Sequence, residues 1–446
     1  MKFFSSAAYA SHYRALWRLG LPIVVGQLGV IVFGITDTLM VGHHSTAELS
    51  AAGFVNNTYN MAMVASIGFA LGLTPVVSAL YGRGEHASIG RKLKNALAAN
   101  LLASLLLMAC MFVFYLNIGR MGQPVELLPL IRPYFLTILF SLPPIMLFNA
   151  FRQCVDGMQD TRVSMWILLC GNVLNIAGNY LLIYGPGPLP ELGLLGAGIS
   201  TLSVRVLMCV IFALIFFRRK RYRAYQEGFR KGRVNRADFM ELNRMGWPVA
   251  LQMFMETASF SLCAIMVGWL GARELATHQV MLSVSTIFFM MYMGMGSAVA
   301  VRVSYFRGQG DVPNIRRSAV AGFCLIMLIA LGCSLLVGGL RHELGAWFTD
   351  DVEVTRAIPA LVIPLLLYQL GDGLQIAFSN ALRGLADVKA VMRYAFVSYF
   401  IVSLPVSYCF AFVFGWELPG IWYSFSVGLT CAGILYSLRF FRRTRA

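Results

Sequence analysis

The sequence has 446 residues, of which 58% are hydrophobic and 13% are charged, and its formal net charge is +16. An average soluble protein carries about 25% charged residues. The apolar residues here occur in runs of about 20, which is the length that a helix needs to cross a bilayer. These features exclude an ordinary soluble domain and predict an all-α polytopic membrane protein.

Twelve apolar segments follow one another along the chain, and each is long enough to span a membrane. The polar, basic start lacks an A-x-A-like site before the first apolar run, so we expect no cleaved signal peptide. The predicted spans are 15–42, 51–80, 94–118, 130–152, 163–185, 195–217, 245–270, 279–305, 318–340, 357–382, 392–414 and 418–438.

Lys and Arg residues are distributed unequally between the two sides of this arrangement. Of the 36, 30 fall at the N-terminus, in the connections after the even-numbered spans or at the C-terminus, whereas five fall on the opposite side. Cytoplasmic loops carry the positive excess, so both termini are predicted to be cytoplasmic. The run RRKRYR at 218–223 directly follows a span, and we therefore interpret it as an anchor beside anionic lipid headgroups and not as a nucleic-acid site.

The two halves of the chain resemble each other at an offset of 226 residues, which becomes 227 further along the chain. LGLP at 19–22 matches MGWP at 245–248, MVG at 40–42 recurs at 266–268, and DGMQD at 156–160 aligns with RGLAD at 383–387. The repeat predicts a six-helix N-terminal half (1–217), a basic cytoplasmic linker (218–244) and a six-helix C-terminal half (245–446). Both halves begin on the same side, so the repeats are parallel. Duplicated carriers of this kind bind substrate between their halves.

Three of the twenty acidic residues lie well inside predicted spans: Asp37, Glu256 and Asp372. A carboxylate at a helix centre costs roughly 2.5–3.5 kcal/mol on insertion scales, and such residues mark ion or proton pathways. We place one cationic side chain, Arg205, well inside a span, and it balances at most one acid. The surplus negative charge suits H⁺ or Na⁺. Asp37 aligns with Cys263 in the repeat, so each half has acids of its own.

Neutral oxygen donors accompany these acids. Tyr368 precedes Asp372 by one helical turn, and Gln252 precedes Glu256 by one turn. Asn175 and Asn179 share a helix face at i, i+4, although such a pair serves equally well as a hydrogen-bonded contact between helices.

The stretch FFMMYMGMG at 288–296 is rich in aromatic and thioether side chains. Aromatic faces attract organic cations, and methionine adapts to varied shapes. Met293 is therefore a weaker substrate-binding candidate, with plain packing as the alternative.

Sequence motifs of enzymes were not found. The chain has no GxxxxGK[ST], HExxH or GxSxG, and its nine cysteines lack metal-type spacing. We expect a protein that is not an enzyme, needs no cofactor and draws its energy from an ion gradient.

At these residues the sequence resembles the multidrug and toxic compound extrusion (MATE) family, in its NorM-type bacterial branch. The segments that carry the resemblance are LPIVVGQLGVIVFGITDTLMVG in the first span, QMFMETASF in the seventh, and YQLGDGLQ with ALRGLAD in the tenth. The resemblance implies a MATE fold and a Na⁺- or H⁺-coupled antiporter that exports organic cations across the bacterial inner membrane. The coupling ion is then transported and is not a resident cofactor.

The resemblance also implies roles for individual residues. Asp37, with Asn175 and Asn179, corresponds to the coupling site of the N-terminal half, and Asp37 is also a weaker substrate-binding candidate. Three residues correspond to the cation site of the C-terminal half and would be the Na⁺ ligands in a sodium-coupled protein: Glu256, Asp372 and Tyr368. Weaker substrate-binding candidates are Gln279 and the acidic pair of the FTDD segment, Asp350 and Asp351.

Two other functions compete with this interpretation. A lipid-linked oligosaccharide flippase of related architecture would need a cavity lined by arginines. A membrane-embedded enzyme acting on lipids would need a nucleophile or metal constellation. The sequence leaves the choice between Na⁺ and H⁺ open, and a complete two-half carrier predicts a monomer in contact with membrane lipids.

Overall fold

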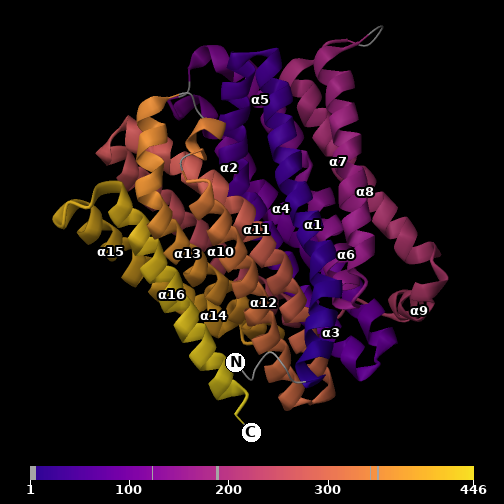
Figure 1. The fold of residues 1–446 in the computed structure, drawn as a ribbon. Coiled ribbons are helices and arrows are strands. Elements are labelled where there is room, and N and C mark those ends of the chain that lie inside the picture. Colours follow the sequence, from indigo (N-terminus) through magenta and orange to yellow (C-terminus); the bar gives the residue numbers. More distant parts are fainter. Residues whose placement is uncertain (1–6, 123, 187–189, 342, 349–350, 446) are drawn as a thin grey trace. The chain divides into compact units, whose positions relative to one another are not determined.

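A computed structural model describes residues 7–122, 124–186, 190–341, 343–348 and 351–445. Within these ranges the chain is helical and has 12 helical segments that are long and apolar enough to cross a membrane (Figure 1). The twelve predicted spans are therefore confirmed. Several helices continue beyond the predicted ends; the first, for example, runs from Ala7 to His44 instead of 15–42.

The spans are formed by single helices or by short helices in series. The helices that form them are α1 (Ala7–His44), α2 (Thr46–Leu71) with α3 (Leu73–Arg83), α4 (His86–Asn117), α5 (Leu128–Phe140) with α6 (Leu142–Gly157), α7 (Thr161–Tyr184), α8 (Gly193–Arg218), α10 (Arg236–Leu270), α11 (Ala272–Gln309), α12 (Val312–Gly339), α13 (Val352–Gly384), α14 (Val388–Phe396) with α15 (Leu404–Tyr408), and α16 (Glu417–Arg443).

The breaks in the fourth and eleventh spans lie at prolines, whereas the break between α2 and α3 lies at Gly72. Pro143 and Pro144 open α6 directly after α5, where the missing N–H groups are tolerated. In the eleventh span, π-helical segments at Val397–Ser403 and Cys409–Val413 flank α15, which begins at Leu404 and Pro405. Pro359 and Pro364, by contrast, lie inside the uninterrupted helix α13.

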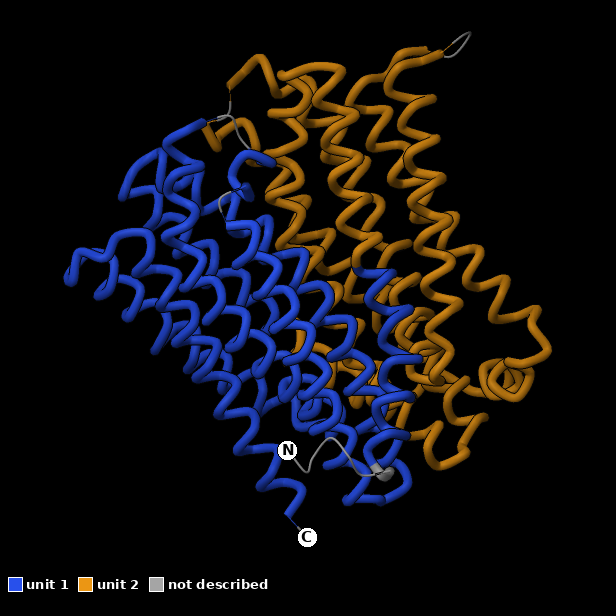
Figure 2. Tube along the Cα trace, viewed as in Figure 1, with its two compact units in different colours: residues 1–27, 251–446 blue, residues 28–250 orange. Residues whose placement is uncertain are grey.

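The chain packs as two compact units (Figure 2). Residues 28–250 form one unit, here called the 28–250 unit, which contains the later part of α1, helices α2 to α9 and the start of α10. Residues 1–27 and 251–446 form the other, here called the 251–446 unit, which contains the start of α1, the rest of α10 and helices α11 to α16.

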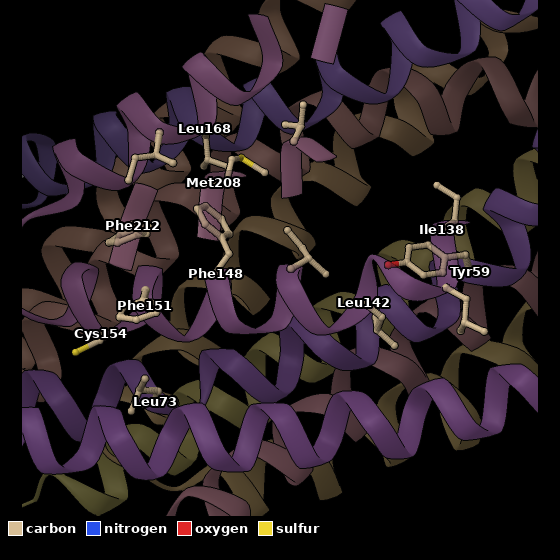
Figure 3. Packing of buried hydrophobic residues seen from close by; sticks show 14 of the residues in the cluster. Tyr59, Leu73, Ile138, Leu142, Phe148, Phe151, Cys154, Leu168, Met208 and Phe212 are labelled. Atoms are coloured by element: carbon tan, nitrogen blue, oxygen red, sulfur yellow. The ribbon is translucent and has the colours of Figure 1, made fainter. Parts of the chain in front are cut away.

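The core of the 28–250 unit is built mainly from residues of α2 to α8 (Figure 3). Phe212 contacts Phe148 and Phe151, with ring centroids 5.6 and 6.0 Å away. A Cβ atom on Gly171 would lie 2.5 Å from Met208 Sδ, and one on Gly178 would lie 2.5 Å from Ser200 Oγ. Because lipid tails are as apolar as the core, small residues that allow close helix contact hold such helices together. They place α7 and α8 side by side.

The core of the 251–446 unit is organised around α13 and α16. Trp422 and Tyr436 on α16 are fully buried. A Cβ atom on Gly433 would lie 2.6 Å from Leu374, and one on Gly371 would lie 2.8 Å from Thr430. This close packing fixes α13, which carries Tyr368 and Asp372.

The basic connection is structured. It contains α9 (Arg223–Lys231), which lies against α4 so closely that a Cβ atom on Gly90 would be 1.9 Å from the carbonyl oxygen of Tyr225. Burial raises the pKa of Tyr225 to about 12. Lys92 on α4 donates to Asp238 on α10 over 2.6 Å and also to Glu241. Within the 28–250 unit, α4 thus contacts both α9 and the start of α10.

Candidate functional site

The first candidate site surrounds Asp37 in the 28–250 unit. The side-chain amide of Asn179 on α7 donates to Asp37 Oδ1, and the hydroxyl of Thr201 on α8 donates to Oδ2 over 3.5 Å. The structure thus brings α1, α7 and α8 together at one carboxylate. Asn179 and Asp37, which were predicted to belong to one site, are thus in direct contact.

Asn175 extends the network away from the acid. Its side-chain oxygen accepts from Asn179 over 3.4 Å, and its amide donates to Ser200 Oγ over 3.4 Å. Both asparagines are fully buried. The i, i+4 spacing on α7 directs both amides to one face, and Gly178 leaves the space in which Ser200 approaches that face.

Arg205 lies on α8, one helical turn after Thr201, and is the cationic group of that helix beside this network. Its Nη1 donates to the hydroxyl of Tyr59 over 2.8 Å and to Ser141 Oγ over 2.5 Å. It acts on Asp37 electrostatically. Its direct hydrogen bonds are to neutral hydroxyls and not to Asp37. Arg205 therefore lowers the negative potential at Asp37, but it does not occupy the position that a bound cation would take.

The second candidate site lies in the 251–446 unit around Glu256 on α10. Gln252 Nε2 donates to Glu256 Oε2 over 2.9 Å, and Arg383 on α13 donates to Gln252 Oε1. The Tyr399 hydroxyl accepts from Gln375 over 2.8 Å and is also hydrogen-bonded to Glu256. Glu256 therefore has polar partners and a guanidinium nearby.

Asp372 is different. It is 1% exposed, and its Oδ2 has no hydrogen-bond donor among the residues that the structure describes. It lies close enough to Glu256 for the two carboxylates to repel each other. A buried carboxylate without a partner is expensive, so this position favours uptake of a proton or a metal cation.

Tyr368 lies one turn before Asp372 in a cluster of aromatic rings. Its ring centroid is 5.5 Å from that of Trp422 and 6.3 Å from those of Phe260 and Phe425. The cluster packs the helix turn that carries Asp372.

A small cavity adjoins Glu256. Its volume is about 10 Å³, which admits a single water-sized particle. Its lining includes Glu256, Gln252, Met293, Gln375 and Arg383. Met293, predicted as a weaker substrate contact, thus lies at the same cavity as Glu256.

The other weaker candidates lie elsewhere. Asp351 caps α13, where its carboxylate accepts from the backbone N–H groups of Glu353 (2.8 Å) and Val354 (3.4 Å). It precedes Asp372 by 21 residues, or about 30 Å along the helix. Gln279 is exposed, 14 residues and about 21 Å along α11 from Met293. Asp350 lies outside the described residues.

The prediction that Arg205 is the one cationic side chain inside a span was wrong, because Arg152 and Arg383 are also buried within candidate spans. Helix α13 extends to Gly384, two residues beyond the predicted end of the tenth span, and Arg383 within it is 4% exposed. Helical spacing could have found it, because positions 372, 376, 380 and 383 share one face. Tyr399 and Gln375 were also missed, since no sequence signal singles them out.

Across the described part of the chain, no group of three or more His, Cys, Asp or Glu side chains is gathered as a metal site would require. The candidate sites each combine one or two carboxylates with amide and hydroxyl oxygens. Such oxygen ligands suit hard cations.

Comparison with known proteins places this arrangement in context. The MatE family profile matches residues 22–181 and 248–409. The chain is 30% identical to the "Probable multidrug resistance protein NorM" of Xanthomonas axonopodis pv. citri, over 99% of this chain and 96% of that protein. It is 27% identical to the protein of the same name from Agrobacterium fabrum, over 98% of this chain and 95% of that protein.

Solved structures share the fold. The crystal structure of the eukaryotic MATE transporter AtDTX14 superposes with a TM-score of 0.87 at 17% identity, covering 98% of this chain and 99% of that one. At this identity the similarity concerns the fold, and it agrees with the predicted architecture.

Proposed function

The chain belongs to the MatE family, and on that premise we propose that it is a cation-coupled antiporter that exports organic-cation drugs by alternating access. The family and the fold are those of transporters, not enzymes. The proposed coupling ion is Na⁺ or H⁺, bound at the acids of the membrane spans.

Asp372 is the observation on which the proposal depends most. Glu256 has Gln252 and Tyr399 as hydrogen-bond partners and Arg383 nearby. Asp372 has a neighbouring carboxylate, and its Oδ2 has no donor among the residues that the structure describes. With both acids ionised and Arg383 charged, the cluster carries one surplus negative charge. One monovalent cation or proton restores neutrality.

This charge balance suggests how an ion drives transport. Binding of the ion at Asp372 and Glu256 removes the surplus charge, and its release restores it. If the two conformations differ in their affinity for the ion, the ion gradient shifts their populations. An ion that lowers drug affinity is itself bound less tightly when drug is present, because coupling is reciprocal.

The Asp37 site is proposed to serve the N-terminal half in the same way. Asp37 retains two donors, Asn179 and Thr201, whichever ion binds there. Asn179 Oδ1 has no donor among the described residues and is therefore available as a ligand beside the carboxylate.

The substrate class is proposed from chemistry and from the relatives. Two relatives are named multidrug resistance proteins. The carboxylates attract cations, and Met293 and the rings beside Tyr368 are suited to flat organic cations. The flippase alternative needs a site dominated by arginine, whereas Arg383 lies beside the carboxylate of Glu256.

The proposed location is the bacterial inner membrane, with both termini in the cytoplasm. We further propose that the chain works as a monomer in contact with membrane lipids and without nucleic acid. The distribution of Lys and Arg supports this orientation.

Ethidium efflux from proteoliposomes, with a Na⁺ or an H⁺ gradient imposed separately, tests the function and identifies the ion. The variants are Asp372→Asn and Glu256→Gln, which keep side-chain shape and remove charge. We expect efflux driven by the coupling gradient to fall to background in both. Glu227→Gln, a change at an exposed carboxylate of α9, serves as the control and is expected to retain efflux.

Size-exclusion profiles and thermal unfolding establish that each variant is folded. Wild-type efflux by folded Asp372→Asn would remove the proposed ion site. Absence of ethidium transport under both gradients, together with transport of a lipid-linked oligosaccharide, would replace the proposal with the flippase.

A further inference from the structure

A groove lies between the Arg162–Leu174 part of α7 and the segment from Leu207 to Arg219 at the end of α8, within the 28–250 unit. Its volume is about 460 Å³, in the range of about 300–1,000 Å³ that small-molecule sites occupy. It is open to its surroundings, because Trp166 on its wall is 61% exposed and Leu174 and Leu207 are 42% and 41% exposed. None of the proposed ion-coupling residues lines it.

The length of the groove matches one leaflet of a bilayer. Its lining extends from Arg162 to Leu174 on α7 and from Leu207 to Arg219 on α8. Twelve residues of helix rise about 18 Å, whereas half of a hydrocarbon core of about 30 Å is about 15 Å. The residues between the charged end and the opposite end are mostly apolar: Val163, Trp166, Ile167, Cys170, Gly171, Met208, Ile211 and Ile215.

Charge is confined to one end of the groove, where α7 begins and α8 ends. Asp160 there is already paired, since it lies 2.9 Å from Arg221 and accepts from the Tyr222 hydroxyl over 2.7 Å. Arg162 and Arg219 are exposed and form no ion pair with any residue in the described ranges. The end of the groove therefore presents two uncompensated positive charges.

We propose that this groove binds a phospholipid with an anionic headgroup, such as phosphatidylglycerol. One acyl chain lies along the apolar walls, and the phosphate lies between Arg162 and Arg219. Guanidinium groups bind phosphate strongly through paired N–H donors. Basic pockets between membrane helices on the cytoplasmic side bind anionic headgroups, and the adjoining connection is the most basic of the chain.

The same features argue against a transported drug as the occupant. An organic cation would place its charge beside two unpaired arginines, which repel it. A zwitterionic lipid would fill the apolar walls equally well, yet its ammonium group would weaken the interaction at the arginines. The charge pattern therefore selects an anionic lipid over the neutral lipids of the same leaflet.

Trp166 allows a direct test, because brominated acyl chains quench a tryptophan that they touch. The full-length protein is placed in phosphatidylcholine nanodiscs that contain a minor fraction of phosphatidylglycerol, with bromine on one lipid or the other. The signal of Trp166 is the difference between wild type and Trp166→Phe. Trp269, which is 65% exposed in the 251–446 unit, is isolated with Trp269→Phe and reports ordinary lipid contact.

We expect brominated phosphatidylglycerol to quench Trp166 well beyond its share of the lipid, and to quench Trp269 only in proportion to that share. Arg162→Ala and Arg219→Ala should each reduce the preference at Trp166 by about fivefold. The corresponding Lys variants should retain most of it. Arg230→Ala and Lys231→Ala, exposed basic residues of α9 outside the groove, are matched controls that should leave it unchanged.

Equal quenching of Trp166 by the two brominated lipids in the wild type would overturn the proposal. So would a preference that survives the double change at Arg162 and Arg219, because general attraction to the basic connection would then explain it. Wild-type protein provides a test that needs no arginine variant: added salt must weaken a preference that rests on exposed charges. Displacement of the lipid by ethidium, without any effect of the arginine changes, would identify the groove as a drug site instead.

Discussion

The side-chain amide of Asn179 on α7 donates a hydrogen bond to the carboxylate of Asp37 on α1. The same amide reaches Asn175 over 3.4 Å, while the Asn179 Oδ1 atom has no donor within the described part of the chain. One asparagine thus stabilises an intramembrane carboxylate and keeps a neutral oxygen beside it. This pairing makes Asn179 the most informative position in the first candidate site.

Asn179→Ala should reduce ion-driven ethidium efflux by about tenfold or more, because a hydrogen bond to a charged group contributes about 1.5–3 kcal/mol. The measurement is the initial rate in proteoliposomes under the coupling gradient. The control is Asn243→Ala, at an amide that bonds only within its own helix, to Phe239 O over 2.9 Å and from Trp247 over 3.0 Å. An Asn179→Ala protein with wild-type rates would assign this amide to helix packing alone.

Arg383 and Glu256 should be energetically coupled through Gln252. Arg383→Gln leaves Glu256 without its nearby positive charge, and removing one partner of a buried charge pair costs about 3–5 kcal/mol. The double variant Glu256→Gln/Arg383→Gln removes both charges, so it should be more stable than Arg383→Gln alone. Thermal unfolding of the four proteins in one detergent gives the coupling as a double-mutant cycle. Additive effects in that cycle would contradict the coupling, because the charge of Arg383 would then be balanced by a group other than Glu256.

Gly90 and Gly228 should be needed to hold α9 against α4. A Cβ atom would lie 1.9 Å from Tyr225 O at Gly90 and 2.0 Å from Ala87 O at Gly228, so either Gly→Ala change must displace the backbone. We expect faster tryptic cleavage in the basic connection and a lower unfolding temperature. Gly53→Ala is the matched control, since nothing lies within 4 Å of its Cβ position in helix α2 and alanine favours helix. Unchanged cleavage in both Gly90→Ala and Gly228→Ala would contradict the close packing of α9 against α4.

Family and span number were predictable because both depend on local sequence. Runs of apolar residues long enough for a bilayer identified the twelve spans, and the acids stood out because charge is rare in such runs. The resemblance built on the segments around Asp37, Glu256 and Asp372 was confirmed by the MatE profile and by relatives named NorM. The assigned roles of these residues remain predictions.

Arg383 illustrates what local sequence could not give. Hydropathy placed it just outside the tenth span, because a charged residue ends an apolar run. Packing of α13 in the 251–446 unit continues the helix to Gly384 and buries the guanidinium. Asp351 was a weaker substrate-binding candidate through the resemblance, and the structure adds that its carboxylate caps the backbone of α13. Its role in substrate binding remains a prediction.

The sequence by itself determined that this is a twelve-span membrane protein of the MatE family with three acids in its spans. Each residue contributes its own free energy of transfer into lipid, so spans and buried acids can be identified from local sequence. Only the tertiary structure decided how those acids differ. Asp37 accepts from Asn179 and Thr201, and Glu256 is surrounded by Gln252, Tyr399 and Arg383. Asp372 has a buried oxygen that receives no hydrogen bond from the described part of the chain. Which partner reaches a carboxylate depends on helices that are distant in the chain and adjacent in space, and hydropathy contains no information about that adjacency.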